Sequence, residues 1–212
     1  MTKNKKTIVA LVLNCAIILL EIIGAILSLQ RHGWSAFLYY TEISNYSTLI
    51  ISVLFVIFGI ITLVKHTHIP HIITILRYIS TTMLTITIIV VVFVLIPLRP
   101  QNALFMLFGN SNLYQHLLCP VISVVSFFIF EKDQKLLHRN ICYALIPTLL
   151  YGTIMLTLNF LKVVEGPYPF LQVYEFPTHK LIVTLIVVLA MSTLISWLSL
   201  KIFNNTKITK SR

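Results

Sequence analysis

Long apolar segments separated by short polar ones fill almost the whole of this 212-residue chain. Each apolar segment is close to the length of about 20 residues that an α-helix needs to cross the hydrocarbon core of a bilayer. Helices satisfy their own backbone hydrogen bonds in lipid, and the alternating pattern of membrane β-barrel strands does not occur in the sequence. The pattern therefore predicts an all-α polytopic membrane protein, a single domain over residues 1–212. Its six transmembrane helices are expected at residues 7–29, 41–64, 71–97, 112–131, 140–161 and 180–203.

The composition supports this prediction. Hydrophobic residues make up 58% of the chain and charged residues only 10%, whereas a soluble domain carries about 25% charged residues. The formal net charge of +10 would suit nucleic acid, but the basic residues lie in predicted loops and tails. There they are typical of topology signals and of contacts with anionic lipid headgroups. We therefore expect membrane lipids as partners and no nucleic acid.

The Lys and Arg residues are unevenly divided between the two ends of the predicted bundle. Four lie at the end away from the termini, namely Arg31, Arg99, Lys162 and Lys180. Twelve lie at or near the end that holds both termini: Lys3, Lys5, Lys6, Lys65, Arg77, Lys132, Lys135, Arg139, Lys201, Lys207, Lys210 and Arg212. Because positively charged loops are retained in the cytoplasm, both termini are predicted to be cytoplasmic. The apolar run from Thr7 to about Leu29 is longer than a signal-peptide core, so we expect a retained first span.

The cytoplasmic half of the predicted bundle is poor in polar residues. Arg77 lies a turn or two inside the third span and is expected to extend its side chain to the membrane boundary. Otherwise this half holds only scattered Ser and Thr residues. His66, His68 and His71 form a cytoplasmic cluster, but no carboxylate or Cys is expected nearby, so no metal site is predicted.

Two polar residues interrupt the apolar segments at matching depth near the outer face. Thr41 begins the second predicted span, and His116 lies about one turn into the fourth. Glu21 lies about eight residues before the outer end of the first span, or roughly 12 Å along a helix. A carboxyl group inside a bilayer is costly unless it is paired or neutral, so Glu21 is expected to be neutral or to pair with His116 or Arg31. Thr41 and His116 together are a candidate nucleophile and base.

Other polar residues converge on the same outer third of the bundle. They are Ser44 and Asn45, which share the helical face of Thr41, with Asn112, Asn159 near the outer end of the fifth span, and Tyr168 in the following loop. Each of these polar residues also has a purely structural interpretation. An intramembrane Thr can bond its own helix or join two helices, a buried His can be a hydrogen-bonding core residue, and Tyr168 can be an interfacial anchor.

Three short motifs, taken in order along a six-span chain, resemble a known family. The first is the aromatic-rich segment from Phe37 to Thr41, and the second runs from Asn112 to His116 and is followed by Pro120. The third is the Tyr-Pro-Phe-Leu segment that begins at Tyr168. Together they resemble the six-span androgen-induced and androgen-dependent membrane proteins, which hydrolyse fatty acid esters of hydroxy fatty acids. The resemblance implies that Thr41 is the nucleophile and His116 the catalytic histidine.

The sequence departs from the animal members of this family in two places. Ser44 and Asn45 follow Thr41 in a pattern that resembles the bacterial branch, and Pro120 follows His116 by four residues, where five are expected in animal enzymes. The resemblance therefore implies a bacterial plasma membrane, and the charge bias predicts that the site lies near its outer leaflet.

The mechanism implied is acyl transfer to threonine. A hydroxyl nucleophile needs a base, and His116 would take the Thr41 proton and later protonate the leaving alkoxide. Glu21 is a candidate to orient the imidazole, and Asn45 or Asn112 a candidate to donate to the oxyanion. The chemistry requires neither a metal nor an organic cofactor. The substrate would be a lipid ester held near the headgroup boundary.

Two other functions remain open from the sequence. The first is a small transporter that uses Glu21, His116 and Asn45 as a proton or solute relay, which predicts a polar path reaching Arg77. The second is a non-catalytic lipid-binding scaffold, whose polar residues only hold the helices together. A lipid cavity ending at Thr41 would favour the enzyme over the scaffold.

Overall fold

The computed structural model describes residues 2–175 and 177–205, which form helices and loops without a strand. Six helical segments in this part of the chain are long and apolar enough to cross a membrane: Asn4–Leu38, Tyr40–Lys65, His71–Leu98, Leu113–Phe130, Asn140–Phe160 and Thr178–Asn205. The prediction of an all-α bundle with six spans is confirmed. Lys207, Lys210 and Arg212, which entered the charge comparison, lie outside the described residues.

The spans combine α-helices with short 3₁₀- and π-helical segments. The first two spans are α1 (Lys3–His32) with the 3₁₀ turn η1 (Gly33–Leu38), and α2 (Tyr40–Lys65). The third joins α3 (His71–Val90), the π-helix η2 (Val91–Leu95) and α4 (Ile96–Leu98). The fourth joins the π-helix η4 (Leu113–Leu118), α6 (Cys119–Val125) and the π-helix η5 (Ser126–Phe130). The last two are α7 (Asn140–Phe160) and α8 (Thr178–Asn205).

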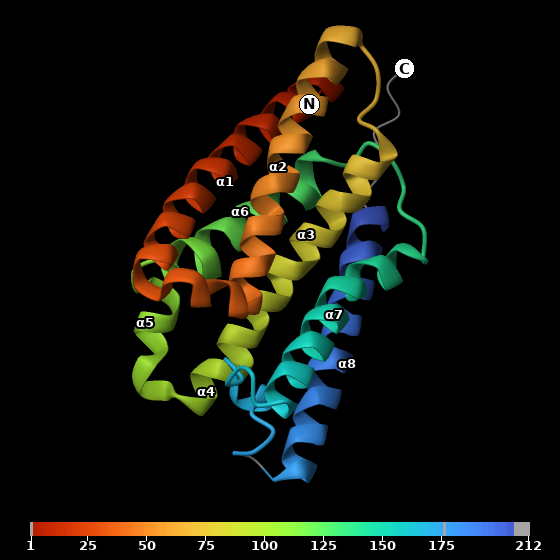
Figure 1. Ribbon diagram of the computed structural model, residues 1–212. Coiled ribbons are helices and arrows are strands. Elements are labelled where there is room, and N and C mark those ends of the chain that lie inside the picture. The colour runs from red at the N-terminus through yellow and green to blue at the C-terminus, as the bar shows by residue number, and fades with distance from the viewer. Residues whose placement is uncertain (1, 176, 206–212) are drawn as a thin grey trace.

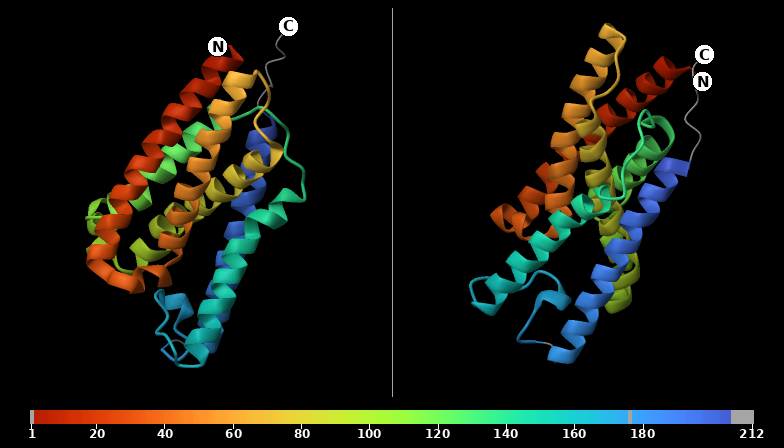
Figure 2. Two further views of the ribbon diagram at one scale, coloured as in Figure 1. Left: turned by 45° about the horizontal axis from the view of Figure 1, so that its top comes forward. Right: turned by 90° about the vertical axis from the view of Figure 1, so that its right-hand side faces the viewer.

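Three shorter helices connect the spans. The 3₁₀ turn η3 (Pro100–Asn102) and α5 (Ala103–Phe108) lie between the third and fourth spans, and the 3₁₀ turn η6 (Pro169–Leu171) lies between α7 and α8. The third span is central, because α3 contacts α2, α6, α7 and α8 (Figures 1 and 2). We call the end where α1 begins and α8 ends the terminal end. The opposite end, which holds η1, α5 and η6, is the distal end (Figure 1).

The interior of the bundle is more polar than its outer surface. On α1 the buried positions recur every three or four residues, at 7, 10, 14, 17, 21, 24 and 28. They include Asn14, Glu21 and Ser28, whereas Val12 and Leu19 are exposed on the outer face. This pattern is expected in hydrocarbon, where apolar side chains face lipid and polar or small side chains pack between helices.

The terminal half of the bundle buries an ion pair that the sequence analysis missed. Arg77 is fully buried and donates from Nε and Nη2 to the two carboxylate oxygens of Glu131, both at 2.9 Å. Asn14 and Ser126 also donate to Glu131 Oε1, at 2.9 and 2.6 Å. The predictions that Arg77 reaches the membrane boundary and that only Ser and Thr accompany it are therefore wrong. Glu131 follows the fourth span directly, and its side chain lies inside the bundle. There the bidentate salt bridge with Arg77 compensates for the desolvation of both charges.

Candidate functional site

Thr41 lies in the first turn of a long helix, where backbone N–H groups lack intrahelical partners. Tyr39 caps α2, so Thr41 is its second residue. The Thr41 side chain is buried at 8% exposure. Its backbone N–H donates to the Tyr168 hydroxyl, and its Oγ1 shares a hydrogen bond with the same hydroxyl, each at 3.4 Å. The helix dipole places partial positive charge at this end of α2, which favours a developing negative charge there.

Ser44 and Asn45 hold the Thr41 backbone in place. Ser44 Oγ donates to the Thr41 carbonyl at 2.8 Å and lies 3.0 Å from Thr87 Oγ1 on α3. Asn45 Nδ2 donates to the same carbonyl at 2.7 Å and to the Gln115 carbonyl at 3.3 Å. Both amide hydrogens of Asn45 are thus engaged with backbone carbonyls. Asn45 therefore positions Thr41, and the expectation that it donates to an oxyanion does not fit this arrangement.

The π-helix η4 and Pro120 leave a backbone carbonyl of the fourth span free to accept a hydrogen bond from Asn45. In η4 the N–H of Cys119 donates to the carbonyl five residues earlier, that of Tyr114. The next bond of this series would join residue 120 to the Gln115 carbonyl, but Pro120 has no N–H. The Gln115 carbonyl accepts from Asn45 instead. Single π-helical turns often occur at functional sites, and this one carries His116.

The imidazole of His116 is oriented by a backbone carbonyl of α5. Its Nδ1 lies 2.6 Å from the Met106 carbonyl oxygen. A carbonyl can only accept, so Nδ1 carries the hydrogen and Nε2 is the acceptor nitrogen of the neutral ring. The carbonyl thus has the orienting role that the sequence analysis assigned to Glu21. Glu21 does not bond Nδ1 in this structure, because α5 packs against the start of the fourth span and supplies the acceptor there.

Glu21 lies apart from the imidazole. It is buried at 2% exposure beside Cys119 and Glu42, and its Oε1 has no hydrogen-bond partner in the described part of the chain. The structure shows no ion pair of Glu21 with His116 or Arg31 among residues 2–175 and 177–205. Two neighbouring cavities both have Thr41 in their walls, and Glu21 lines neither of them.

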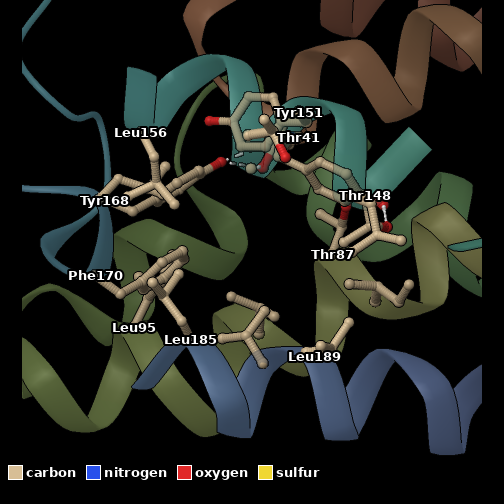
Figure 3. Close-up of a pocket in the computed structure, with 18 of the residues that line it drawn as sticks. Thr41, Thr87, Leu95, Thr148, Tyr151, Leu156, Tyr168, Phe170, Leu185 and Leu189 are labelled. Carbon is tan, nitrogen blue, oxygen red and sulfur yellow. Dashed lines mark hydrogen bonds between the residues drawn. The ribbon is translucent and has the colours of Figure 1, made fainter. Parts of the chain in front are cut away.

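The first of these cavities is apolar and has a volume of about 230 Å³. Its walls come from the start of α2, the distal part of the third span, α7, η6 and α8. Thr41 and Tyr168 lie on one wall, and Leu185 and Leu189 of α8 lie on the opposite wall (Figure 3). Apart from Thr41, its hydroxyl groups are those of Tyr40, Thr87, Thr148, Tyr151, Thr153 and Tyr168. The cavity is suited to a hydrocarbon chain that ends at a polar group.

The second cavity, called the polar cavity, is more polar than the first and has a volume of about 260 Å³. Its polar lining residues are Arg31, His32, Tyr39, Thr41, Glu42, Arg99, Asn102, Ser111, Asn112, Gln115, His116 and Tyr168. Thr41 and Tyr168, together with Leu95, line both cavities. Thr41 and His116 therefore face the same space, although they share no hydrogen bond in the described part of the chain.

Tyr168 belongs to a buried aromatic cluster at the distal end. Its ring stacks on Phe170 with centroids 5.2 Å apart, and it meets Tyr39 and Tyr151 edge-on. Burial raises the pKa of Tyr168 to about 12. Tyr168 is therefore a neutral hydroxyl at pH 7. Its oxygen accepts the Thr41 N–H, which leaves its hydrogen free to donate to Thr41 Oγ1 or to a bound group.

The remaining predicted residues support the site from farther away. Asn159 ties down the loop that carries Tyr168, because its side chain donates to the Val164 carbonyl at 3.1 Å and accepts the Val173 N–H at 2.8 Å. Asn112 lines the polar cavity and donates to the Phe105 carbonyl at 2.9 Å. One Nδ2 hydrogen of Asn112 remains available to the cavity.

Several residues of the site were not predicted. Glu42, next to Thr41, accepts from Gln115 Nε2 at 2.7 Å and from Ser28 Oγ. Both Glu42 and Gln115 adjoin a predicted catalytic residue in the sequence, which is the signal that could have identified them. The Met106 carbonyl carries no such signal, because every residue has a carbonyl group.

The histidine cluster at the terminal end differs from its prediction in one respect. His68 Nδ1 contacts Asp133 Oδ2 at 3.0 Å, so a carboxylate does lie beside it. No group of three or more His, Cys, Asp or Glu side chains in the described ranges is placed to hold a metal ion. Comparison of the chain with protein-family models, curated proteins and solved structures finds no match. Support for a function therefore comes from the residues and cavities of this chain.

Proposed function

We propose that this protein is an intramembrane hydrolase of lipid esters, with Thr41 as the nucleophile and His116 as the base. The observation that supports this proposal is the position of Thr41 on the wall shared by an apolar and a polar cavity. A lipid ester has the same division, since its acyl chain is apolar while its carbonyl and leaving alcohol are polar. An acyl chain in the apolar cavity would bring the ester carbonyl to Thr41.

In the first step, Thr41 Oγ1 attacks the ester carbonyl carbon while His116 Nε2 takes the hydroxyl proton. The carbon–oxygen bond to the alcohol then breaks, and the alkoxide receives the proton from Nε2. In the second step, Nε2 takes a proton from water, and the resulting hydroxide attacks the acyl-threonine. The fatty acid leaves, and Thr41 Oγ1 recovers its proton from Nε2. The Met106 carbonyl holds the Nδ1–H tautomer that both steps require.

The negative charge of the tetrahedral intermediate has two sources of stabilisation. The Tyr168 hydroxyl is 3.4 Å from the backbone nitrogen and from Oγ1 of Thr41, and its raised pKa keeps it protonated as a donor. The amino end of α2 adds the partial positive charge of the helix dipole. Asn112 can donate its second amide hydrogen from the polar cavity. We expect the Thr41–His116 hydrogen bond to form when an ester fills both cavities, because catalytic hydrogen bonds often tighten only in the substrate complex.

The proposed substrates are fatty acid esters with a polar hydroxy-lipid leaving group, such as fatty acid esters of hydroxy fatty acids. The distal end carries Arg31, Arg99, Lys162 and Lys180, fewer basic residues than the terminal end. By the charge bias the distal end faces outward, which would place the site near the outer leaflet of a bacterial plasma membrane. The proposed reaction uses water and protein groups alone.

The relay proposed for a transporter has less support. It requires Glu21, His116 and Asn45 to form one polar path, but the Asn45 amide is engaged with backbone carbonyls and His116 Nδ1 with Met106. Arg77, where the path would lead, is enclosed by Glu131, Ser52 and Ser123. The apolar cavity that ends at Thr41 favours the enzyme over the lipid-binding scaffold.

A lipid-like fluorophosphonate probe tests the proposal in nanodiscs. Wild-type protein is expected to be labelled, with labelling lost in Thr41→Ala and in His116→Ala. Thr153→Ala is the matched control, because Thr153 lines the same apolar cavity but has no hydrogen bond to Tyr168 in the described part of the chain. Labelling that persists in Thr41→Ala, or that is lost equally in Thr153→Ala, would contradict the assignment of Thr41.

A further inference from the structure

The short helix α5 presents apolar side chains outward at the distal end. It has six residues, too few to span a bilayer, yet Leu104 is 77% exposed and Phe108 is 54% exposed. Arg31 and Arg99 line the polar cavity beside it. Apolar side chains flanked by basic residues at the end of a membrane span are typical of the boundary between headgroups and acyl chains. The lipid surface is the environment that suits this face of α5.

The inner side of α5 is attached to the site by three contacts. The Met106 carbonyl accepts from His116 Nδ1 at 2.6 Å, and the Phe105 carbonyl accepts from Asn112 at 2.9 Å. The Arg31 guanidinium carbon lies 4.5 Å from the centroid of the Phe105 ring. α5 is thus in contact with the first and fourth spans at once.

Gly109 allows the chain to turn back closely after α5. A Cβ atom added at Gly109 would lie 2.3 Å from the Phe105 ring and 2.7 Å from the Phe105 carbonyl oxygen. Neither separation is tolerated without a shift of α5. The attachment of α5 therefore depends on this glycine and on the contacts of Phe105 and Met106, rather than on a long helix of its own.

We propose that α5 is a lipid-surface-binding element whose insertion at the distal membrane boundary positions His116. The Nδ1 hydrogen of His116 has its acceptor on α5, so α5 fixes both the tautomer and the ring orientation. When Leu104 and Phe108 leave the lipid boundary, Met106 moves with them and the imidazole loses its constraint. The consequence for hydrolysis rests on the proposed function, whereas the coupling of α5 to the tautomer does not.

The test uses the full chain in nanodiscs and a double variant, Leu104→Ser with Phe108→Ser. These are the two most exposed apolar side chains of α5. The matched control is Phe160→Ser with Leu161→Ser, because these residues are 63% and 62% exposed at the distal end of α7. Quenching by brominated lipids of a fluorophore attached at position 110 reports the depth of the α5 region. The ¹⁵N spectrum of the His116 ring reports the tautomer without any need for activity.

The wild type and the α7 control are expected to show shallow lipid contact at α5 and a single Nδ1–H tautomer. The α5 variant is expected to lose lipid contact and to show mixed tautomers, with the rate of probe labelling reduced about 10-fold, since a positioned base contributes about 100-fold or more. An unchanged tautomer after α5 leaves the lipid would overturn the proposal, and so would α5 lying in water in the wild type. If the tautomer responds but no variant is ever labelled, the positioning by α5 holds and the hydrolase proposal fails.

A second variant guards against misfolding of the first. Phe105→Leu removes the ring under Arg31, whereas Phe105→Trp keeps an aromatic face there. Phe105→Leu is expected to mix the tautomers and Phe105→Trp to retain the single one. The same spectrum from both variants would contradict the role of this contact.

Discussion

The terminal and distal halves of the bundle each bury a cluster of polar side chains, but they satisfy those side chains differently. In the terminal half, Arg77, Asn14 and Ser126 all donate to the carboxylate of Glu131. In the distal half, Thr41 and Tyr168 share two long hydrogen bonds, both at 3.4 Å, and line two cavities. Bonds between side chains of different helices hold those helices together, whereas a cluster that borders a cavity can bond a ligand.

The supporting residues of the distal half show the same division. Ser44, Asn45 and Gln115 are engaged with backbone carbonyls or with Glu42. Their bonds hold Thr41 in place on the wall of the two cavities and do not involve its hydroxyl. The comparison teaches that the polar residues of a membrane bundle should be sorted by what remains unbonded, rather than by residue type alone.

The largest expected effect is the loss of activity without loss of stability in Thr41→Ala. Removing a nucleophile typically costs about 10⁴-fold or more in kcat. Thr41→Ser should retain activity, because it keeps the hydroxyl. Hydrolysis of a lipid ester in nanodiscs gives the rates, and thermal unfolding checks the fold. A Thr41→Ala protein with more than a tenth of wild-type kcat would contradict the role of Thr41 as the nucleophile.

The next largest effect falls on the terminal half, where Arg77→Met should destabilise the protein without a direct effect on the site. Breaking a buried ion pair from one side costs about 3–5 kcal/mol, because the other charge stays buried without its partner. The double variant Arg77→Met with Glu131→Leu should recover much of this loss. Chemical unfolding in micelles measures both. Equal stability of the wild type and Arg77→Met would show that the network is not a structural lock.

Tyr168→Phe should reduce kcat by about 100-fold, the usual effect of losing one oxyanion donor. Burial raises the pKa of Tyr168 to about 12, so the hydroxyl stays protonated as pH rises from about 6 to about 10. The ratio of wild-type to Tyr168→Phe rates should then be constant across that range. A ratio that falls towards one in the lower part of the range would mean that Tyr168 acts as an ionised base instead.

The smallest expected effect comes from filling the apolar cavity. Gly152 lines this cavity, and a Cβ atom added there would meet nothing within 4 Å. Gly152→Leu should therefore fold normally and raise KM about 10-fold for long acyl chains, while esters of short acids are hydrolysed as before. A uniform change for all chain lengths would mean that the acyl chain lies elsewhere.

The six spans could be predicted because apolar length is a property of the sequence itself. The site could be predicted only in part. Thr41, His116 and Tyr168 stand out as polar or motif residues near one end, and the structure brings them around shared cavities. The Arg77–Glu131 pair was missed because Glu131 begins the charged segment 131–135, and such a segment is expected to lie in water. The position of the Met106 carbonyl and the π-helical turn η4 are features of the backbone conformation, which residue types alone do not specify.

Trapping of the acyl-enzyme tests the central claim most directly. The wild-type protein in nanodiscs would be mixed with an activated ester of a fatty acid, such as a p-nitrophenyl ester, and quenched in acid within the first turnover. Peptide mass spectrometry would then locate the acyl group. We predict a single acyl group on Thr41, absent from His116→Ala. An acyl group on another residue, or turnover of the ester with no acyl-protein at any time, would contradict threonine catalysis in this bundle.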